Sequence, residues 1–243
     1  MAPVLTARDI TLRFPGAAQP VLRDFSLSLE AGEFLAVVGG SGVGKSTLLR
    51  ALAGLLTPSG GEVELNSPRR AGQRRRAIVF QDGRLMPWRT LRANIEYGLE
   101  GLGVSRAERR ERVDEVLALT GLGELADRYP HQLSGGQAQR GGIARALAVQ
   151  PDVLLMDEPF SAVDALTRGG LQDELIRIWQ ASGKAVVFVT HDIGEAAFLA
   201  DRVMVLAGQP AGVALDRPIG VDRPRTHDDA ALAEFSAQIA AAL

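Results

Sequence analysis

Apolar residues follow two different patterns along this chain. Short apolar runs rich in β-branched and aromatic residues lie at about 34–38, 77–80, 153–156 and 185–190, and the segments between them show helical periodicity. This alternation predicts an α/β fold with a largely parallel sheet that is buried on both faces. In the first thirty residues apolar and polar positions alternate instead, which predicts a half-exposed antiparallel sheet.

No convincing strand pattern lies between about 82 and 150. The stretch from Ser105 to Leu119 has apolar residues at helical spacing behind a charged run, which is typical of an amphipathic helix. We therefore predict that the whole chain forms one domain. A helical subdomain at about 82–150 is inserted into an α/β core formed by 1–81 and 151–243.

Composition excludes several classes of site and partner. The 27 basic and 29 acidic residues give a net charge of −2, so the chain has no general attraction for nucleic acid or anionic lipid. There are no cysteines, which excludes disulfides and thiolate metal ligands. The arginine clusters at 69–70 and 74–76 predict a surface loop, and the charged run at 106–112 predicts a solvated helix face. No stretch approaches the ~20 apolar residues that cross a bilayer, so the chain is expected to be soluble by itself.

A glycine-rich segment fits the phosphate-loop pattern G-x-x-x-x-G-K-[ST]. It lies between an apolar run and a helix expected roughly over Lys45 to Leu56. Its backbone amides are expected to surround the β-phosphate of a nucleotide. Lys45, one of only two lysines in the chain, would reach the β- and γ-phosphates, Ser46 would bind Mg²⁺, and Thr47 would hold the α-phosphate side. The predicted phosphate-binding residues are Gly39, Gly40, Ser41, Gly42, Val43, Gly44, Lys45, Ser46 and Thr47.

Two later apolar runs end in polar residues that suit nucleotide hydrolysis. The run at 153–156 ends in Asp157 and Glu158, of which Asp157 would bind Mg²⁺ and Glu158 would act as general base for the attacking water. The run at 185–190 ends in His191, which would donate a hydrogen bond to the γ-phosphate or hold the water. The alternatives are acids that merely end a strand and a structural histidine.

The segment Leu133-Ser134-Gly135-Gly136-Gln137 precedes a helix expected over Ala138 to Val149. Small polar residues that open a helix form a second anion site within one chain. Two phosphate sites and one nucleotide predict a composite site between two subunits.

With these motifs in this order, nearly the whole chain resembles the ATP-binding subunit of ABC transporters. Residues 39–46 resemble the Walker A loop of that family, 133–137 its signature, and 161–164 its D-loop. Gln81 resembles its Q-loop glutamine, Asp157 and Glu158 the end of its Walker B strand, and His191 its switch histidine.

This resemblance implies a head-to-tail homodimer that binds ATP and Mg²⁺ between two subunits. Ser134, Gly135, Gly136 and Gln137 would contact the nucleotide of the opposite subunit, with Ser134 and Gly136 at its γ-phosphate. Asp164 would signal across the interface, and Gln81 would contact Mg²⁺ or water. Outside the motifs, Phe14 stands where the family usually has a tyrosine that stacks on adenine, and Val21 is assigned to the same nucleotide site.

The resemblance also implies partners and a location. The stretch 79–90 is most similar to the subunits of nitrate, sulfonate and taurine importers, with Met86-Pro87-Trp88 where such subunits receive the permease. It implies a pair of integral-membrane permease subunits, an extracytoplasmic solute-binding protein reached through them, no nucleic acid, and a peripheral position on the cytoplasmic face of the inner membrane. The alternatives are the ATPase of an exporter and a soluble ABC ATPase that acts on nucleic acid or ribosomes.

Four residues depart from the family pattern. Phe14 lacks the tyrosine hydroxyl, and Val163 replaces the usual leucine of the D-loop. Gly141 and Gly142 stand where a Val-Ala-like pair is usual, although each glycine inside a helix costs about 1 kcal/mol relative to alanine.

Overall fold

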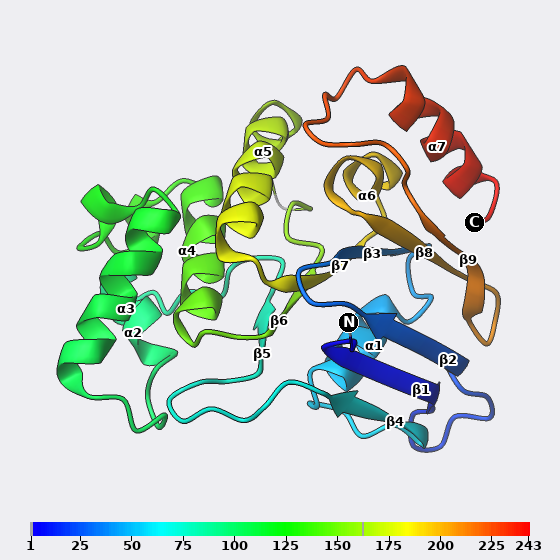
Figure 1. The fold of residues 1–243 in the computed structure, drawn as a ribbon, viewed down its shortest axis with the longest axis horizontal. Coiled ribbons are helices and arrows are strands. Elements are labelled where there is room, and N and C mark those ends of the chain that lie inside the picture. Colours follow the sequence, from blue (N-terminus) through cyan, green and yellow to red (C-terminus); the bar gives the residue numbers. More distant parts are fainter. Residues whose placement is uncertain (1, 162) are drawn as a thin grey trace. The chain divides into compact units, whose positions relative to one another are not determined.

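The computed structural model describes residues 2–161 and 163–243, so Ala162 of the predicted D-loop lies outside the described residues. The chain forms two compact units (Figure 1). The first consists of Met1–Ser67 and Ala185–Leu243, and the second of Pro68–Lys184. The predicted division into an α/β core and a helical insertion stays a prediction, because the second unit contains strands and helices together.

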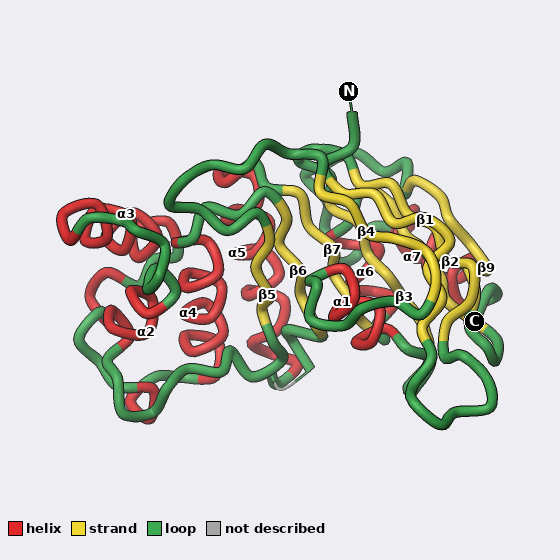
Figure 2. Tube along the Cα trace, turned by 90° about the horizontal axis from the view of Figure 1, so that it is seen from below, coloured by secondary structure: helices red, strands yellow, loops and turns green. Residues whose placement is uncertain are grey.

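The first unit contains the antiparallel sheet that the first thirty residues predict. Its strands lie in the order β2, β1, β4, and the yellow tubes of Figure 2 show them side by side. One face is buried, because every core-facing residue such as Ile10 or Phe25 is apolar. The strands are β1 (Leu5–Leu12), β2 (Leu22–Leu29) and β4 (Gly60–Leu65).

The first unit also holds four strands in the order β7, β3, β8, β9. β3 pairs in parallel with β7 and β8, and all residues of β3 and β7 are buried. β9 pairs antiparallel with β8 at the edge. The elements are β3 (Phe34–Gly39), β7 (Ala185–Thr190), β8 (Arg202–Ala207), β9 (Gly212–Pro218), α1 (Lys45–Leu52), α6 (Ile193–Leu199) and α7 (Ala230–Ala240).

The second unit contains one parallel strand pair and most of the helical residues. The pair is β5 (Arg76–Val79) with β6 (Val153–Asp157). Helices α2, α3 and α4 pack on one another within this unit. The helices are α2 (Leu91–Tyr97), α3 (Arg106–Leu119), α4 (Gly135–Ala148) and α5 (Ala165–Ser182), with short 3₁₀ turns η1 (Gly123–Leu125) and η2 (Pro130–Gln132). The α/β fold class predicted from the sequence is confirmed.

Two helix boundaries differ from their predictions. α1 ends at Leu52 instead of Leu56, because Gly54 adopts a φ of 71° and reverses the chain. α4 begins at Gly135 instead of Ala138, because the Ser134 side chain caps it there.

The segment after β9 is fastened to the end of α6. Nη1 of Arg225 donates to the carbonyl oxygens of Ala197, Phe198 and Ala200 at 3.0, 3.0 and 2.6 Å. The ring of His227 stacks on that of Phe198, with centroids 3.9 Å apart. Burial lowers the pKa of Arg225 to about 10, so its guanidinium stays protonated at neutral pH and occupies the carbonyl groups at the helix end.

Among the described residues, the structure contains no helix with the length and apolarity that a bilayer crossing requires.

Candidate nucleotide-binding site

The phosphate-loop pattern forms the turn from β3 into α1. Gly42 and Gly44 adopt φ values of 79° and 108°, a region that only glycine enters readily. A Cβ on Gly44 would lie 2.6 Å from Cγ1 of Val21, so any side chain there would also collide with a neighbour. Val21 therefore packs against the loop, whereas Phe14 is 48% exposed.

Lys45 is the first residue of α1 and is only 5% exposed. Its Nζ donates to the carbonyl oxygens of Gly39 at 2.8 Å and Gly40 at 3.0 Å. The ammonium group therefore lies inside the loop, in the position from which it can exchange these carbonyls for phosphate oxygens. Ser46 and Thr47 follow in the first helical turn and are half-buried.

His191 belongs to the same sheet edge as the phosphate loop. In the parallel pairing of β7 with β3, Thr190 is the partner of Val38. The next residue of β3 is Gly39, where the loop begins, and the next residue after β7 is the exposed His191. The structure therefore brings His191 and the start of the loop together within the first unit.

The remaining predicted residues lie in the second unit, beginning with the acidic pair. β6 ends at Asp157, and Glu158 follows with a φ of 44°. A left-handed conformation is strained for a residue with a Cβ, and such residues concentrate at functional sites. The backbone N–H and Oγ of Ser161 both donate to the Glu158 carbonyl, at 3.2 and 2.8 Å, and hold this turn.

The signature residues form the start of α4. Ser134 is its N-cap, and Ser134 and Gln137 exchange hydrogen bonds of 3.2 and 2.9 Å between side chain and backbone. Gly136 is buried against α5, since a Cβ there would lie 3.0 Å from a methyl group of Leu171. Gly135 is exposed and has open space around it, so a ligand can approach the amides of this helix end.

Gln81 is exposed in the loop after β5, and Trp88 further along this loop is 73% exposed. The fully buried Asn94 of α2 holds the intervening turn. Its amide donates to the carbonyls of Met86 and Arg89 at 3.1 and 3.0 Å, and its Oδ1 accepts from the Met86 N–H. The sequence motifs do not identify Asn94. Asp164 caps α5 by accepting from the N–H of Thr167 at 3.0 Å.

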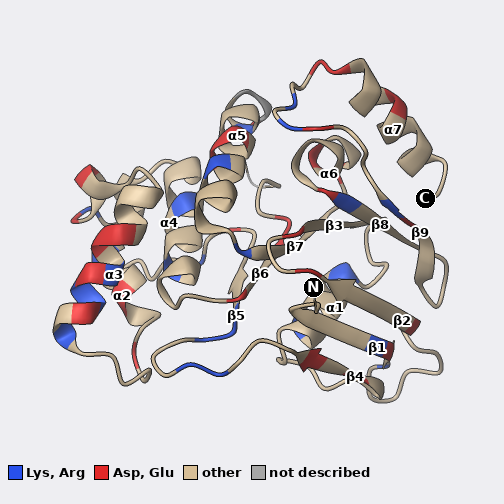
Figure 3. Ribbon diagram, viewed as in Figure 1, with Lys and Arg blue, Asp and Glu red and all other residues tan. Residues whose placement is uncertain are grey.

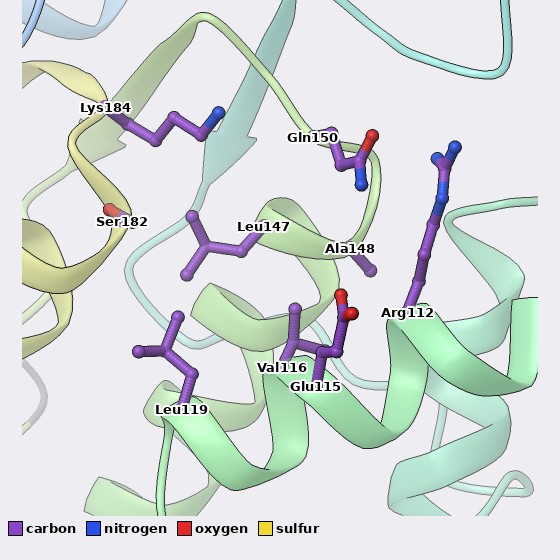
Figure 4. Close-up of a pocket in the computed structure, with 9 residues that line it drawn as sticks. All are labelled: Arg112, Glu115, Val116, Leu119, Leu147, Ala148, Gln150, Ser182 and Lys184. Atoms are coloured by element: carbon purple, nitrogen blue, oxygen red, sulfur yellow. The ribbon is translucent and has the colours of Figure 1, made fainter. Parts of the chain in front are cut away.

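A cavity of about 140 Å³ lies elsewhere in the second unit, between α3 and the ends of α4 and α5 (Figure 4). Lys184 and Arg112 stand at its opposite ends, with Leu147 and Val116 between them. None of the predicted nucleotide-binding residues lines it.

Charges of both signs are mixed along α3, as Figure 3 shows. Arg112 pairs with Glu108 at 2.5 Å, and Arg92 of α2 with Asp114 at 2.6 Å. The charged run at 106–112 therefore lies on the helix surface as predicted except at Arg112, which is buried. Within the described ranges 2–161 and 163–243, no group of three or more acidic or histidine side chains forms a metal cluster.

The parallel strands, the glycine loop at the end of β3 and the lysine that opens α1 define a P-loop nucleotide-binding protein. The family model of ABC transporters matches residues 22–161. A putative ATP-binding protein of Brucella abortus is 44% identical over 98% of this chain and 91% of its own length. The chain belongs to the ABC transporter family, and within it is an ATPase.

Other relatives and solved structures agree with this assignment. The taurine import ATP-binding protein TauB of Pseudomonas entomophila is 47% identical over 86% of this chain and 82% of its own length. CbiO1 of Clostridium perfringens, described as part of the ABC transporter complex cbiONQ, shares 28% identity over 90% of this chain and 89% of its own, with a TM-score of 0.79. A dimeric ATP-binding cassette in a post-hydrolysis state bound to ADP and Pi shares 31% identity over 90% and 100%, with a TM-score of 0.73.

Proposed function

We propose that this ABC ATPase is the energy-coupling subunit of a bacterial importer for a small oxyanion, with taurine or a related sulfonate as the first candidate. The observation that carries this proposal is the 46–47% identity to taurine import ATP-binding proteins over 86–87% of the chain. The glycine loop that encloses Lys45 supports the ATP-dependent part of the proposal.

In this proposal, ATP lies between the phosphate loop of one subunit and the signature of a second copy. Two anion-directed helix starts in one chain, at α1 and at α4, support it, because one nucleotide per subunit leaves the second start for the nucleotide of another copy. The exposed Gly135, at the first position of α4, would face the γ-phosphate of the partner's nucleotide. The dimeric ATP-binding cassette to which the chain is similar gives the same expectation.

The residues of this chain would divide the chemistry among themselves. Lys45 would exchange its two loop carbonyls for phosphate oxygens. Glu158 would accept the proton of the attacking water, and the imidazole of His191 would donate a hydrogen bond to the γ-phosphate. Phe14 would stack on the adenine and Val21 would support the loop.

The donor set also fits Mg²⁺. The hydroxyl of Ser46, the carboxylate of Asp157 and the amide oxygen of Gln81 are hard oxygen ligands, which this ion prefers. When bound with ATP, Mg²⁺ neutralises charge on the β- and γ-phosphates.

In this proposal, a pair of membrane permease subunits binds the ATPase, and ATP hydrolysis drives their conformational change. The largely exposed Trp88, on the turn that Asn94 fixes, supports a contact there. The subunit would then lie peripherally on the cytoplasmic face of the membrane, with a solute-binding protein on the other side.

The first test is to tag this chain, purify it gently from native membranes and identify what accompanies it. We expect a multi-spanning permease, and in proteoliposomes containing both and the binding protein we expect taurine to stimulate ATP hydrolysis. Recovery of ribosomes or nucleic acid instead would contradict the importer function. Stimulation by nitrate and not by taurine would retain the importer and replace its substrate.

A further inference from the structure

The loop that carries Gln81 is fastened to one face of the signature helix α4. Nε2 of Gln139 donates to the carbonyl of Phe80 at 3.2 Å. The guanidinium of Arg145 donates to the carbonyls of Gly83 and Arg84, each at 2.7 Å. Residues three or four apart share a helix face, so Gln139, Gly142 and Arg145 form one continuous contact along the loop.

Gly142 brings helix and loop into backbone contact. A Cβ on Gly142 would lie 2.9 Å from Cα of Gly83 and 3.0 Å from its carbonyl oxygen. A Cβ on Gly83 would lie 2.8 Å from the carbonyl oxygen of Ala138, and Gly83 also has a φ of 66°. The close approach gives a physical reason for a glycine inside α4, where helix propensity alone would favour alanine.

The guanidinium of Arg145 is partly buried against this loop and bonded to it. Burial lowers the pKa of Arg145, and Asp82, which neighbours Gln81, acts in the opposite direction. The side chain of Arg84 lies over the ring of Phe80, 3.9 Å from its centroid, and covers the same turn. The hydrogen-bonded anchors therefore stand on both sides of Gln81, at Phe80 and at Gly83.

The N-cap of α4 is Ser134, five residues before Gln139. A short helix transmits displacement of its first turn to the next with little deformation, because every turn is hydrogen-bonded to the one before. We propose that Gln139 and Arg145 are positioning residues for Gln81, so that movement of the signature residues and of Gln81 is coupled through α4. This inference rests on the proposed function, because the roles of Ser134 and Gln81 at the nucleotide are themselves part of that proposal.

The test is a double-mutant cycle on ATP hydrolysis by the purified full-length chain. Arg145→Ala is expected to lower kcat roughly ten- to a hundred-fold, as misplacement of a reacting group by about 1 Å does, with KM for ATP changed less than about two-fold. In a chain that already carries Gln81→Ala, Arg145→Ala should have little further effect. An equal loss in both backgrounds would overturn the proposal, because Arg145 would then act independently of Gln81.

Arg140→Ala is the matched control on the same helix. Arg140 also donates to a backbone carbonyl, that of Thr120 at 3.1 Å, but it does not hold the Gln81 loop. We expect Arg140→Ala to change kcat less than Arg145→Ala at a similar loss of thermal stability. An equal effect on kcat from both arginines would contradict a specific positioning role.

Two further measurements keep the proposal testable if Arg145→Ala folds poorly. Arg145→Lys retains the charge but not the fork that reaches two carbonyls, and it should recover only part of kcat; Gln139→Ala should reproduce the loss more weakly. In Arg145→Lys and in Gln139→Ala, hydrogen exchange should be faster than in the wild type at amides 80–89 and unchanged in α5. Unchanged exchange of the loop would contradict the proposal, whereas a wild-type chain without ATPase activity would contradict the proposed function instead.

Discussion

Oγ1 of Thr190 donates a hydrogen bond of 2.7 Å to Oε2 of Glu195, and both side chains are buried. The same Oγ1 accepts from the N–H of Asp192 at 3.0 Å, and the Asp192 side chain caps α6 through the N–H of Glu195 at 3.1 Å. His191 lies between these anchored residues and has an exposed side chain. Its backbone is therefore held by its neighbours at the edge where the phosphate loop begins.

From this arrangement we predict that His191→Ala impairs catalysis and leaves folding intact. The expected loss in kcat for ATP hydrolysis is roughly ten- to a hundred-fold. In the wild type the imidazole would orient the reacting groups through its hydrogen bond, and the variant lacks that bond. The melting temperature should stay close to that of the wild type, since the exposed ring contributes little to packing. Normal turnover by a folded variant would assign His191 a structural role.

Lys45→Ala should weaken ATP binding roughly ten- to a hundred-fold in titration calorimetry, because a charge-assisted hydrogen bond to phosphate is lost. Lys45→Arg should restore little, since the guanidinium is too wide for the turn around Gly44. Lys184→Ala, which removes the other lysine of the chain, is the control and should bind ATP normally. Unchanged affinity in Lys45→Ala would exclude the phosphate-loop function.

Glu158→Gln should retain ATP binding and lower kcat by roughly 10² to 10⁴, because the amide cannot accept the proton of the attacking water. The closed dimer should then accumulate with ATP and appear in gel filtration as a larger species. Near-normal hydrolysis would show that another group is the general base.

The Glu174 carboxylate predicts a pH dependence of stability. The hydrogen bond from Arg177, at 2.8 Å, lowers the pKa of Glu174 from its usual 4.5, and burial acts against it. A lowered folded pKa means that the ion pair stabilises the fold above about pH 4.5 and is lost as the pH falls through the folded value. Glu174→Gln should lower the melting temperature by about 1–3 °C at pH 7, because the pair is partly exposed. This difference should shrink below pH 4.5; a constant difference would contradict the ion-pair explanation.

Two glycines inside helices should respond oppositely to alanine. A Cβ on Gly170 of α5 would meet open space, so Gly170→Ala should raise stability by about 0.5–1 kcal/mol through helix propensity. Gly142→Ala should gain less or lose stability, since its Cβ would press on the backbone of Gly83. Thermal melts of both variants check this, and equal gains would contradict the tight contact at Gly83.

The hydrophobic pattern predicted the buried strands because β3 and β7 are enclosed on both faces and read as continuous apolar runs. β4 and β9 were not predicted, since neither contains a fully buried residue. In β4 the short alternation from Glu62 to Leu65 carries the strand signal, and it was missed. β8 was also missed, although Val203 to Leu206 forms a buried run that carries the signal.

Some residues of the candidate site could likewise be predicted from the sequence, and others could not. The phosphate loop, the acidic pair and the signature are each contiguous in sequence, so spacing alone proposes them. Gln139 and Arg145 act on carbonyls that only the folded chain brings near. Gln139 lies 59 residues from its acceptor, and Arg145 lies 61 and 62 residues from its two acceptors. No local pattern encodes such contacts. Gly142, unexplained by sequence, is accounted for by the backbone of Gly83.

The arginine contacts at the end of α6 bear on how this protein can be handled in the laboratory. A chain shortened to end before Ile219 would lose Arg225, and with it the donor that occupies the carbonyls of Ala197, Phe198 and Ala200. It would also lose His227 and uncover Phe198. Affinity tags and fluorescent fusions are therefore better added beyond α7, with residues 219–243 kept intact.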